Sequence, residues 1–353
     1  MTIQKLNTKL ENPFILKTII PYAWAIFILS LLTGCHQKET TINGRVKGIK
    51  NAVIEISGHG KLWDANIVDE KFQISAIPDR AEFFKLKILF SGGKNKTVEY
   101  PIYLAEGEYN FVLDSASIQR YPLVKTQVKF QNELSYFYLS DLPDLSNLEN
   151  FVRKHSKSPV SGYLLNQVSE KDMRENPGYY DKLFRLLDPE VTETAYSENA
   201  KNKIEGYTRI RPGAPMPKIE GRMPDGKPFN RNLLKGKLTL LTFWASWNNP
   251  SLNDIPHLKF LYDKNHTNGF EILGIAIDKK EERWKKAIAA NGLSWLHVAD
   301  FKGAYSKNFE NFYTNKLPCY IIIGPDLKIV DFDVPVESVN IYINDFLKQA
   351  SIE

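Results

Sequence analysis

Two kinds of segment alternate between residues 236 and 350. Runs of consecutive β-prone apolar residues predict buried strands, and the stretches between them, with apolar residues three and four positions apart, predict helices. The expected strands are 238–244, 270–277, 295–298, 319–323 and 328–332, and the expected helices are 252–264, 280–290, 304–312 and 336–350. Alternation of this kind predicts an α/β domain in which helices cover a sheet on both faces.

The part of the chain before residue 210 follows two other patterns. Short β-prone runs between turn residues fill 41–115 and predict a small antiparallel β-domain, whereas residues 116–205 carry apolar positions at helical spacing. A chain of 353 residues is also too long for one small domain. We therefore expect a β-rich N-terminal domain at 35–115, a helical connector at 116–208 and the α/β domain at 209–353.

The first 34 residues are expected to be a targeting signal. Three lysines precede an apolar run, Ile19–Leu32, which is too short to span a membrane comfortably. The run ends in Leu32-Thr33-Gly34-Cys35, which resembles the lipobox of bacterial lipoproteins and implies that Cys35 becomes lipid-modified after cleavage. An uncleaved anchor helix is the alternative. In both cases the folded part is held at a membrane in the bacterial cell envelope, facing the periplasm or the outer surface.

Charge and residue types exclude several classes of function. The formal net charge is +5, and it falls to +3 without the three lysines and one glutamate of the signal segment. This excess is too small to predict a nucleic acid partner. The six histidines and two cysteines show no metal-ligand spacing, and no glycine-rich loop joins a strand to a helix as a phosphate-binding loop would. We expect neither a metal nor a cofactor.

The stretch from Phe243 to Pro256 reads FWASWNNPSLNDIP. It resembles the FWASWCxPCxxEIP segment of TlpA/ResA-type membrane-anchored thiol-disulfide proteins, and the proline-rich lead Arg211–Pro217 resembles the entry to their domain. The resemblance covers residues 210–350 well and the whole mature chain loosely, as a thioredoxin-like lipoprotein of Bacteroidetes. It implies a thioredoxin-like fold. The two cysteine positions, however, hold Asn248 and Ser251.

This replacement indicates that dithiol chemistry has been lost. A dithiol oxidoreductase needs one sulfur to attack and a second to resolve the mixed disulfide. Asn248 has no nucleophile, and the hydroxyl of Ser251 is a poor one without a general base. Asn249 and Pro250 suit the start of a helix, as an N-cap and a first helical residue. We assign no catalytic residue here.

The segment Leu317-Pro318-Cys319 resembles the family's cis-proline segment. The resemblance implies that Leu317 and Pro318 lie beside the start of the helix, where the backbone before the proline pairs with an extended peptide. Trp247, Asn249 and Pro250 would complete this binding groove. Cys319 is the one free thiol left if Cys35 is lipidated. It is either a small buried residue or a reactive thiol that forms mixed disulfides, and the sequence leaves both open.

Three functions follow from these residues. The first is a membrane-anchored thioredoxin-fold protein that binds an envelope protein or peptide without dithiol turnover. The second is an oxidoreductase-like protein that acts through the single thiol of Cys319. The third is a structural component of the envelope. The missing sulfurs favour the first over an enzyme, since a fold by itself does not establish an activity.

Overall fold

The computed structural model describes residues 39–90, 97–140 and 145–350. The chain forms two compact units, which divide between residues 141 and 142. None of the helices in the described ranges combines the length and the apolar character that crossing a bilayer requires. The expected signal segment 1–34 and the lipidation site Cys35 lie outside these ranges.

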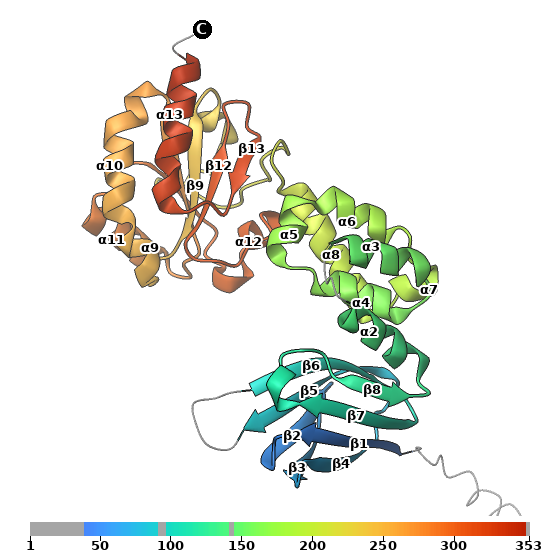
Figure 1. Ribbon diagram of the computed structural model, residues 1–353. Helices are drawn as coiled ribbons and strands as arrows, with labels where there is room; N and C mark the ends of the chain where they lie inside the picture. The colour runs from blue at the N-terminus through green and yellow to red at the C-terminus, as the bar shows by residue number, and fades with distance from the viewer. Residues whose placement is uncertain (1–38, 91–96, 141–144, 351–353) are drawn as a thin grey trace, which may run out of the picture. The chain divides into compact units, whose positions relative to one another are not determined.

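The first unit is built on a single eight-stranded sheet (Figure 1). Its strands are β1 (Thr40–Lys47), β2 (Asn51–Gly58), β3 (Lys61–Val68), β4 (Lys71–Ala76), β5 (Glu82–Phe90), β6 (Thr97–Leu104), β7 (Glu108–Asp114) and β8 (Leu123–Thr126). Their order in the sheet is β6-β5-β2-β3-β4-β1-β7-β8, and the pair β1 and β7 runs parallel. The other neighbouring pairs are antiparallel, so the predicted antiparallel β-domain is confirmed apart from this one pair.

Alternation of side chains along the strands builds the core of this unit. In β4, for example, Phe72, Ile74 and Ala76 are buried and the residues between them are exposed. The buried faces of the strands share one core, as the period of two in a strand requires. The β-rich unit continues past residue 115, where the sequence placed its end, because β8 pairs with β7 and the helix α2 (Lys129–Leu139) follows it.

Six helices open the second unit. They are α3 (Leu145–Lys154), α4 (Pro159–Gln167), α5 (Glu170–Glu175), α6 (Pro177–Phe184), α7 (Pro189–Thr192) and α8 (Ala195–Arg209). The apolar spacing predicts one continuous helix at 160–170 and another at 191–204, but the structure divides each of them, because Ser169 and Thr194 act as N-caps within them. The Ser169 hydroxyl accepts from the N–H of Asp172 (3.1 Å), and the Thr194 hydroxyl accepts from that of Ser197 (3.4 Å).

The rest of the second unit is an α/β domain around a five-stranded sheet. Its strands are β9 (Leu238–Trp244), β10 (Phe270–Ala276), β11 (Leu296–Ala299), β12 (Cys319–Ile323) and β13 (Ile329–Phe332), in the order β11-β10-β9-β12-β13. β9, β10 and β11 are parallel, whereas β12 runs antiparallel to both β9 and β13. The helices are α9 (Asn249–Asn253), α10 (Ile255–Asn265), α11 (Glu281–Asn291), α12 (Lys307–Asn311) and α13 (Val339–Ala350). The predicted order of strands and helices is confirmed.

Helices cover both faces of this sheet, as predicted. Leu240 and Trp244 of β9 belong to a core that includes residues of α10, α11 and α13. Phe243 points the other way, where its ring lies 5.8 Å from that of Phe309 in α12 and 5.4 Å from that of Phe312. All seven residues of β9 are buried, which explains why this strand reads as a continuous apolar run.

Candidate functional site

The expected site lies where β9 ends and α9 begins. After Trp244 the chain turns through Ala245 to Asn248, and the N–H of Asn248 closes this turn on the carbonyl of Ala245 (3.0 Å). The turn is also anchored by the segment that follows β10, because the carboxylate of the buried Asp278 accepts from both the N–H and the hydroxyl of Ser246 (3.0 and 2.5 Å). The residues before the helix are therefore held by main-chain and side-chain bonds.

Asn248 is the N-cap of α9. Its Oδ1 accepts from the N–H of Ser251 (2.9 Å) and from the hydroxyl of the same residue (2.7 Å). The expectation that Asn249 is the cap was wrong. Asn249 is instead the first helical residue and Pro250 the second, where a missing N–H costs no helical hydrogen bond. The two positions aligned with cysteines in the resembled segment thus contact each other through a capping interaction.

This geometry leaves Ser251 without a base to activate it. Its side chain is 4% exposed, and its hydroxyl donates to a neutral amide oxygen, which cannot take up the proton. The space behind it measures about 10 Å³, room for one water at most. Trp244 and Trp295 are among the residues that line this space. Ser251 is therefore placed as a structural residue.

The sheet brings the cis-proline segment to the same place. In the antiparallel pair β9 and β12, Cys319 lies opposite Phe243 and Tyr320 opposite Thr242. Pro318, the residue before β12, is therefore level with the end of β9, next to the turn that leads into α9. The bond between Leu317 and Pro318 is cis. The expected juxtaposition of residues 317–319 with the helix start is present in the structure.

Leu317 keeps its main-chain hydrogen-bonding groups unused. In the described part of the chain, no hydrogen bond involves its N–H or its carbonyl. Leu317 and Pro318 are both half-buried. Trp247 is 59% exposed, a large fraction for a tryptophan. Asn249 and Pro250 are exposed as well. All five residues predicted to form a groove therefore retain surface on which a partner could bind.

Cys319 is buried, and it is the free cysteine of the described residues. It is 1% exposed, and burial raises the pKa of its thiol to about 12 although a hydrogen bond with the side chain of Thr314 lowers it. Few thiolates exist at neutral pH under these conditions. His257, the histidine nearest in sequence to the helix start, forms no hydrogen bond with Cys319 within the part of the chain described. The structure favours the first of the two interpretations, a buried apolar residue.

Sequence reasoning missed one polar contact of this site. The hydroxyl of Tyr320 donates to Oδ2 of Asp254 at 2.6 Å, and it connects β12 with the junction of α9 and α10. Burial and the nearby Asp254 carboxylate raise the pKa of Tyr320 well above its usual range. The position of Asp254 could have been noticed, because it stands where the resembled FWASWCxPCxxEIP segment has glutamate.

The buried histidine near the site, His297, is not part of a metal-binding cluster of the described residues. His297 is 2% exposed between Trp244 and Trp295, and burial lowers its pKa to about 3. Its two ring nitrogens have no hydrogen-bond partner in the described ranges of the chain. Among the described residues, no three side chains of the metal-binding types gather closely enough to hold an ion.

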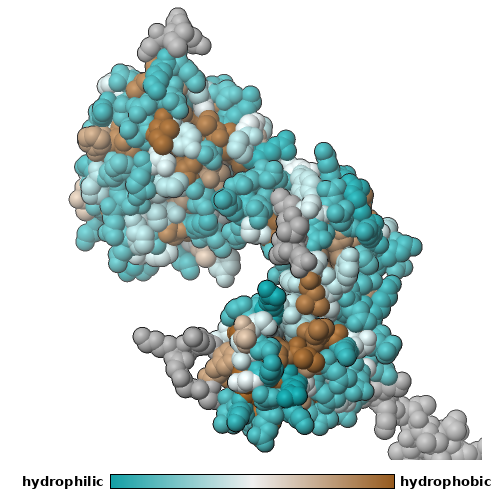
Figure 2. All heavy atoms as spheres, viewed as in Figure 1, coloured by the Kyte–Doolittle hydropathy of each residue, from teal (hydrophilic) through white to brown (hydrophobic). Residues whose placement is uncertain are grey.

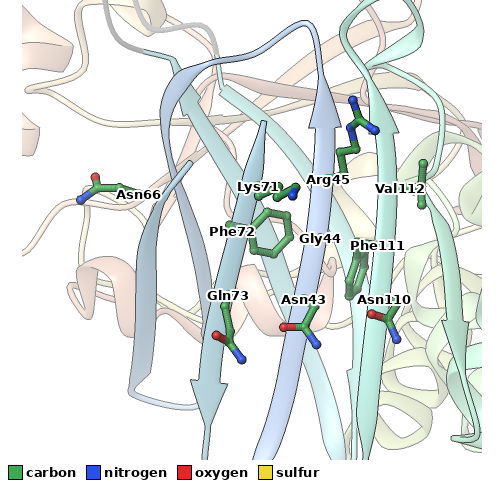
Figure 3. Close-up of a pocket in the computed structure, with 10 residues that line it drawn as sticks. All are labelled: Asn43, Gly44, Arg45, Asn66, Lys71, Phe72, Gln73, Asn110, Phe111 and Val112. Atoms are coloured by element: carbon green, nitrogen blue, oxygen red, sulfur yellow. The ribbon is translucent and has the colours of Figure 1, made fainter. Parts of the chain in front are cut away.

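The β-rich unit carries a shallow depression, lined by both polar and apolar residues, on the outer face of its sheet. Figure 3 shows Gln73, Asn43 and Asn110 on the neighbouring strands β4, β1 and β7, and the strand register places Asn43 opposite both of the others. The depression has a volume of about 620 Å³. Its residues include amides, Arg45 and Lys71 but no nucleophile with an adjacent base, so it offers no catalytic site.

The visible surface of the molecule is mostly hydrophilic. Figure 2 shows hydrophobic residues in small, separate patches over the second unit. Single exposed apolar side chains are normal in soluble domains. On this view the second unit shows no extended apolar face.

The C-terminal part of the chain is similar in sequence to known proteins. Residues 236–329 match the sequence model of a family described as thioredoxin-like. The thiol-disulfide oxidoreductase ResA of Bacillus thuringiensis (strain Al Hakam) is 31% identical over 107 residues, which are 30% of this chain and 60% of that protein. ResA of Bacillus subtilis (strain 168) is 23% identical over 125 residues, 35% of this chain and 68% of that protein. The chain thus spans less than two thirds of the first of these relatives.

Solved structures give a similar picture. A thiol-disulfide oxidoreductase from Bacteroides fragilis is 30% identical, with 37% of this chain and 98% of that one covered and a TM-score of 0.36. The C-terminal domain of a putative thiol-disulfide oxidoreductase from Bacteroides thetaiotaomicron is 27% identical, with 40% and 99% covered and a TM-score of 0.38. Residues 236–329 of this chain are a thioredoxin-like domain, and its sequence relatives include thiol-disulfide oxidoreductases of the ResA type.

Proposed function

We propose that this chain is a thioredoxin-fold protein of the bacterial cell envelope that binds a protein or peptide partner without dithiol turnover. One observation carries the proposal. At the helix start, where a dithiol protein would hold its two sulfurs, the carboxamide of Asn248 caps the helix and binds the hydroxyl of Ser251. Neither group can form a disulfide.

The chemistry of the remaining groups supports the absence of turnover. Disulfide exchange needs a thiolate that attacks and a second thiol that resolves the mixed disulfide. Cys319 is 1% exposed with a pKa raised to about 12, so it supplies neither in the folded protein. The alternative function through Cys319 alone therefore has no support in the geometry.

Binding is supported by the groups that stay available. An extended peptide can pair with a free main-chain N–H and carbonyl as an added β-strand does, and Leu317 offers both. The exposed indole of Trp247 offers a flat apolar surface near the same helix start. Together they provide directional hydrogen bonds and buried apolar area, the two components of peptide recognition.

Location in the envelope is supported by the sequence alone. Residues 1–34 have the charge and apolar pattern of a signal segment, and the tetrapeptide that ends at Cys35 resembles a lipobox. We propose a lipid anchor at Cys35 that holds the folded units at a membrane. Mass spectrometry of the mature N-terminus tests this part: an unmodified Cys35 or an uncleaved signal would contradict it.

Reduction of insulin disulfides tests the absence of turnover. The full-length chain, purified in detergent, is expected to give no rate above that of the reductant alone. The matched control replaces both positions, Asn248→Cys with Ser251→Cys, and it should give measurable turnover because the fold around the helix start is already present. Turnover by the unaltered chain would overturn the proposal. Loss of that turnover in Cys319→Ser would then favour the single-thiol function.

A thiol titration tests the state of Cys319 independently. The native protein is expected not to react with a polar disulfide reagent. In denaturant, Cys319 should react and release one equivalent of the reagent's thiol. Native reaction at a rate near that of a free thiol would show that the side chain is accessible, and it would contradict the buried arrangement.

A further inference from the structure

A cleft in the second unit adjoins the cis-proline segment. It has a volume of about 400 Å³, within the range of pockets that bind small ligands. Residues of α5 and α8 line one side, and residues of the segment 304–316 line the other. This segment leads directly to Leu317, whose main chain we propose to pair with a peptide.

The two sides of the cleft are fitted closely to each other. The rings of Tyr207 in α8 and Tyr313 lie 4.9 Å apart in an edge-to-face arrangement. A Cβ atom at Gly206 would come within 2.4 Å of the Tyr313 ring, so only glycine admits this packing. Tyr313 itself has a φ of +45°, a backbone conformation that non-glycine residues rarely adopt. Unfavourable conformations of this kind concentrate at functional sites.

Two side chains of the cleft carry hydrogen-bond donors that no described residue accepts. Tyr207 is 5% exposed as a residue, but its hydroxyl is not among the fully buried unpaired polar atoms of the described residues. The ammonium of Lys203 donates to the carbonyl of Asn166 at 2.7 Å, which leaves two of its three N–H groups unused within the same ranges. Burial lowers the pKa of Lys203. Lys203 is half-buried, so these donors remain free to bind water or an acceptor on a ligand that enters the cleft.

Cations dominate the wall of the cleft nearest to the cis-proline segment. Arg174 and Lys316 both donate to the carboxylate of Asp333, at 3.0 and 2.5 Å. One carboxylate thus faces two cations there. Glu310, which also belongs to the segment 304–316, is neutralised by Lys307 at 2.6 Å. Glu170 is the remaining acid of the cleft; it is exposed, and its negative charge acts on Lys203, Tyr207 and Tyr313. The three cations Arg174, Lys203 and Lys316 still outnumber the two acids Glu170 and Asp333, which favours an anionic ligand group.

We propose that this cleft binds a carboxylate of the partner peptide, and this proposal rests on the proposed function. The ammonium of Lys203 and the hydroxyl of Tyr207 would donate to the two carboxylate oxygens. Phe309 and Phe332, which also line the cleft, would contact the apolar part of the same residue. The carboxylate comes either from the chain terminus of the peptide or from an acidic side chain.

The distance along the chain is compatible with a short peptide. Residues 314–316 line the cleft, and Leu317 follows immediately. An extended chain advances about 3.3 Å per residue, so a peptide paired with Leu317 reaches the cleft within a few residues. Its carboxylate would then lie in the cleft while its other end extends toward Trp247.

Fluorescence anisotropy with three labelled peptides tests the proposal on the full-length chain in detergent. One peptide ends in phenylalanine with a free carboxylate, the second is its C-terminal amide, and the third is the amide with glutamate in place of the phenylalanine. If the carboxylate comes from the chain terminus, only the first peptide should bind tightly. If it comes from an acidic side chain, the third peptide should bind tightly. Lys203→Gln is expected to weaken the preferred peptide about tenfold, the loss of one charge-assisted hydrogen bond.

Two further variants keep the result interpretable. Tyr207→Phe removes only the hydroxyl. It should weaken binding of the preferred peptide severalfold without affecting binding of the amide form of the first peptide. Lys201→Gln is the matched control, because Lys201 lies on the same helix, is exposed and pairs with Glu205 (3.9 Å), and it should leave binding unchanged. Lys203→Arg should preserve part of the affinity if the charge matters.

The outcomes separate this inference from the proposed function. Binding that depends on Trp247 but is equal for all three peptides and insensitive to Lys203→Gln would overturn the carboxylate site and leave the peptide groove standing. If no peptide binds but phenylacetate binds in a Lys203-dependent way, the cleft takes a small free acid, and the proposed peptide function fails. Absence of both kinds of binding overturns both proposals.

Discussion

Replacing Asn248 with alanine is expected to destabilise the thioredoxin-like domain by about 2–3 kcal/mol. Loss of the cap to the N–H of Ser251 contributes about 1 kcal/mol. The hydroxyl of Ser251, 4% exposed, also loses its acceptor, and leaving a buried hydroxyl unpaired costs a further 1–2 kcal/mol or so. The prediction follows from the observation that Asn248 acts as a structural residue.

Two matched variants make this test specific. Asn248→Asp keeps an oxygen in the same place and adds a negative charge at a helix N-terminus, so its stability should stay within about 0.5 kcal/mol of the unaltered protein. Asn249→Ala changes an exposed side chain without a hydrogen bond in the described structure, and its effect should also stay within about 0.5 kcal/mol.

Urea unfolding followed by tryptophan fluorescence measures these differences in the right domain. One described tryptophan, Trp63, lies in the β-rich unit, whereas the others lie in the thioredoxin-like domain, at positions 244, 247, 284 and 295. A loss below about 0.5 kcal/mol for Asn248→Ala would refute the capping argument. So would an equal loss for Asn249→Ala, because the cap would then lie at the position that the sequence suggested.

Three other predictions concern groups around the site. Burial lowers the pKa of His297 to about 3. As the pH falls through 6.5, this histidine therefore binds a proton in the unfolded chain but not in the folded chain. Stability should therefore fall by about 2 kcal/mol from pH 7 to pH 5, and the difference between the unaltered protein and His297→Leu in urea titrations should show this slope. Tyr320→Phe removes a hydrogen bond to the carboxylate of Asp254, so it should cost about 1.5–3 kcal/mol by urea unfolding and weaken peptide binding in anisotropy titrations. Burial alone would raise the pKa of Asp333, but hydrogen bonds from its two cations bring it below the ordinary value. Its stabilisation, about 1 kcal/mol, should be present above pH 4 and lost as the pH falls through the lowered pKa. Asp333→Asn should remove it, as acid titrations of both proteins would show.

Long apolar runs made the sheet of the second unit predictable. The runs 238–244 and 319–323 have the same bounds in the sequence interpretation and in the structure, because strands buried on both faces contain few polar residues. The order of strands and helices followed from the same runs. The parallel pairing of β1 with β7 was not predicted, since a strand pattern shows which face is buried and not which strand lies beside it.

Helix ends were less predictable, because several residues in a row are good caps. Asn248 and Asn249 have the same side chain, and the cap is decided by the turn that bonds the Asn248 N–H to Ala245. Ser169 and Thr194 each divide a stretch that has continuous helical periodicity. Periodicity extends across such breaks when the apolar positions on both sides face the same core.

Contacts between residues that only the tertiary fold brings together could not be predicted from the sequence. Arg174 and Asp333 form an ion pair across 159 residues of chain, and the ring of Tyr207 contacts that of Tyr313 across 106 residues. The burial of Cys319 likewise depends on what covers it, so the sequence left its reactivity open. The five groove residues could be named beforehand because a local motif and a resemblance identify them.

The arrangement at the helix start argues for binding over a purely structural role. A folded domain gains stability when it buries apolar surface and pairs its main-chain groups. Here the indole of Trp247 stays 59% exposed, and the N–H and carbonyl of Leu317 form no hydrogen bond within the described chain. Neither feature stabilises the domain, yet each is what an extended peptide needs in order to bind. A structural role would favour a smaller polar residue at position 247, so Trp247→Ser should leave the free energy of unfolding nearly unchanged while it abolishes peptide binding in anisotropy titrations. A large loss of stability with unaltered binding would instead show that the indole serves the fold.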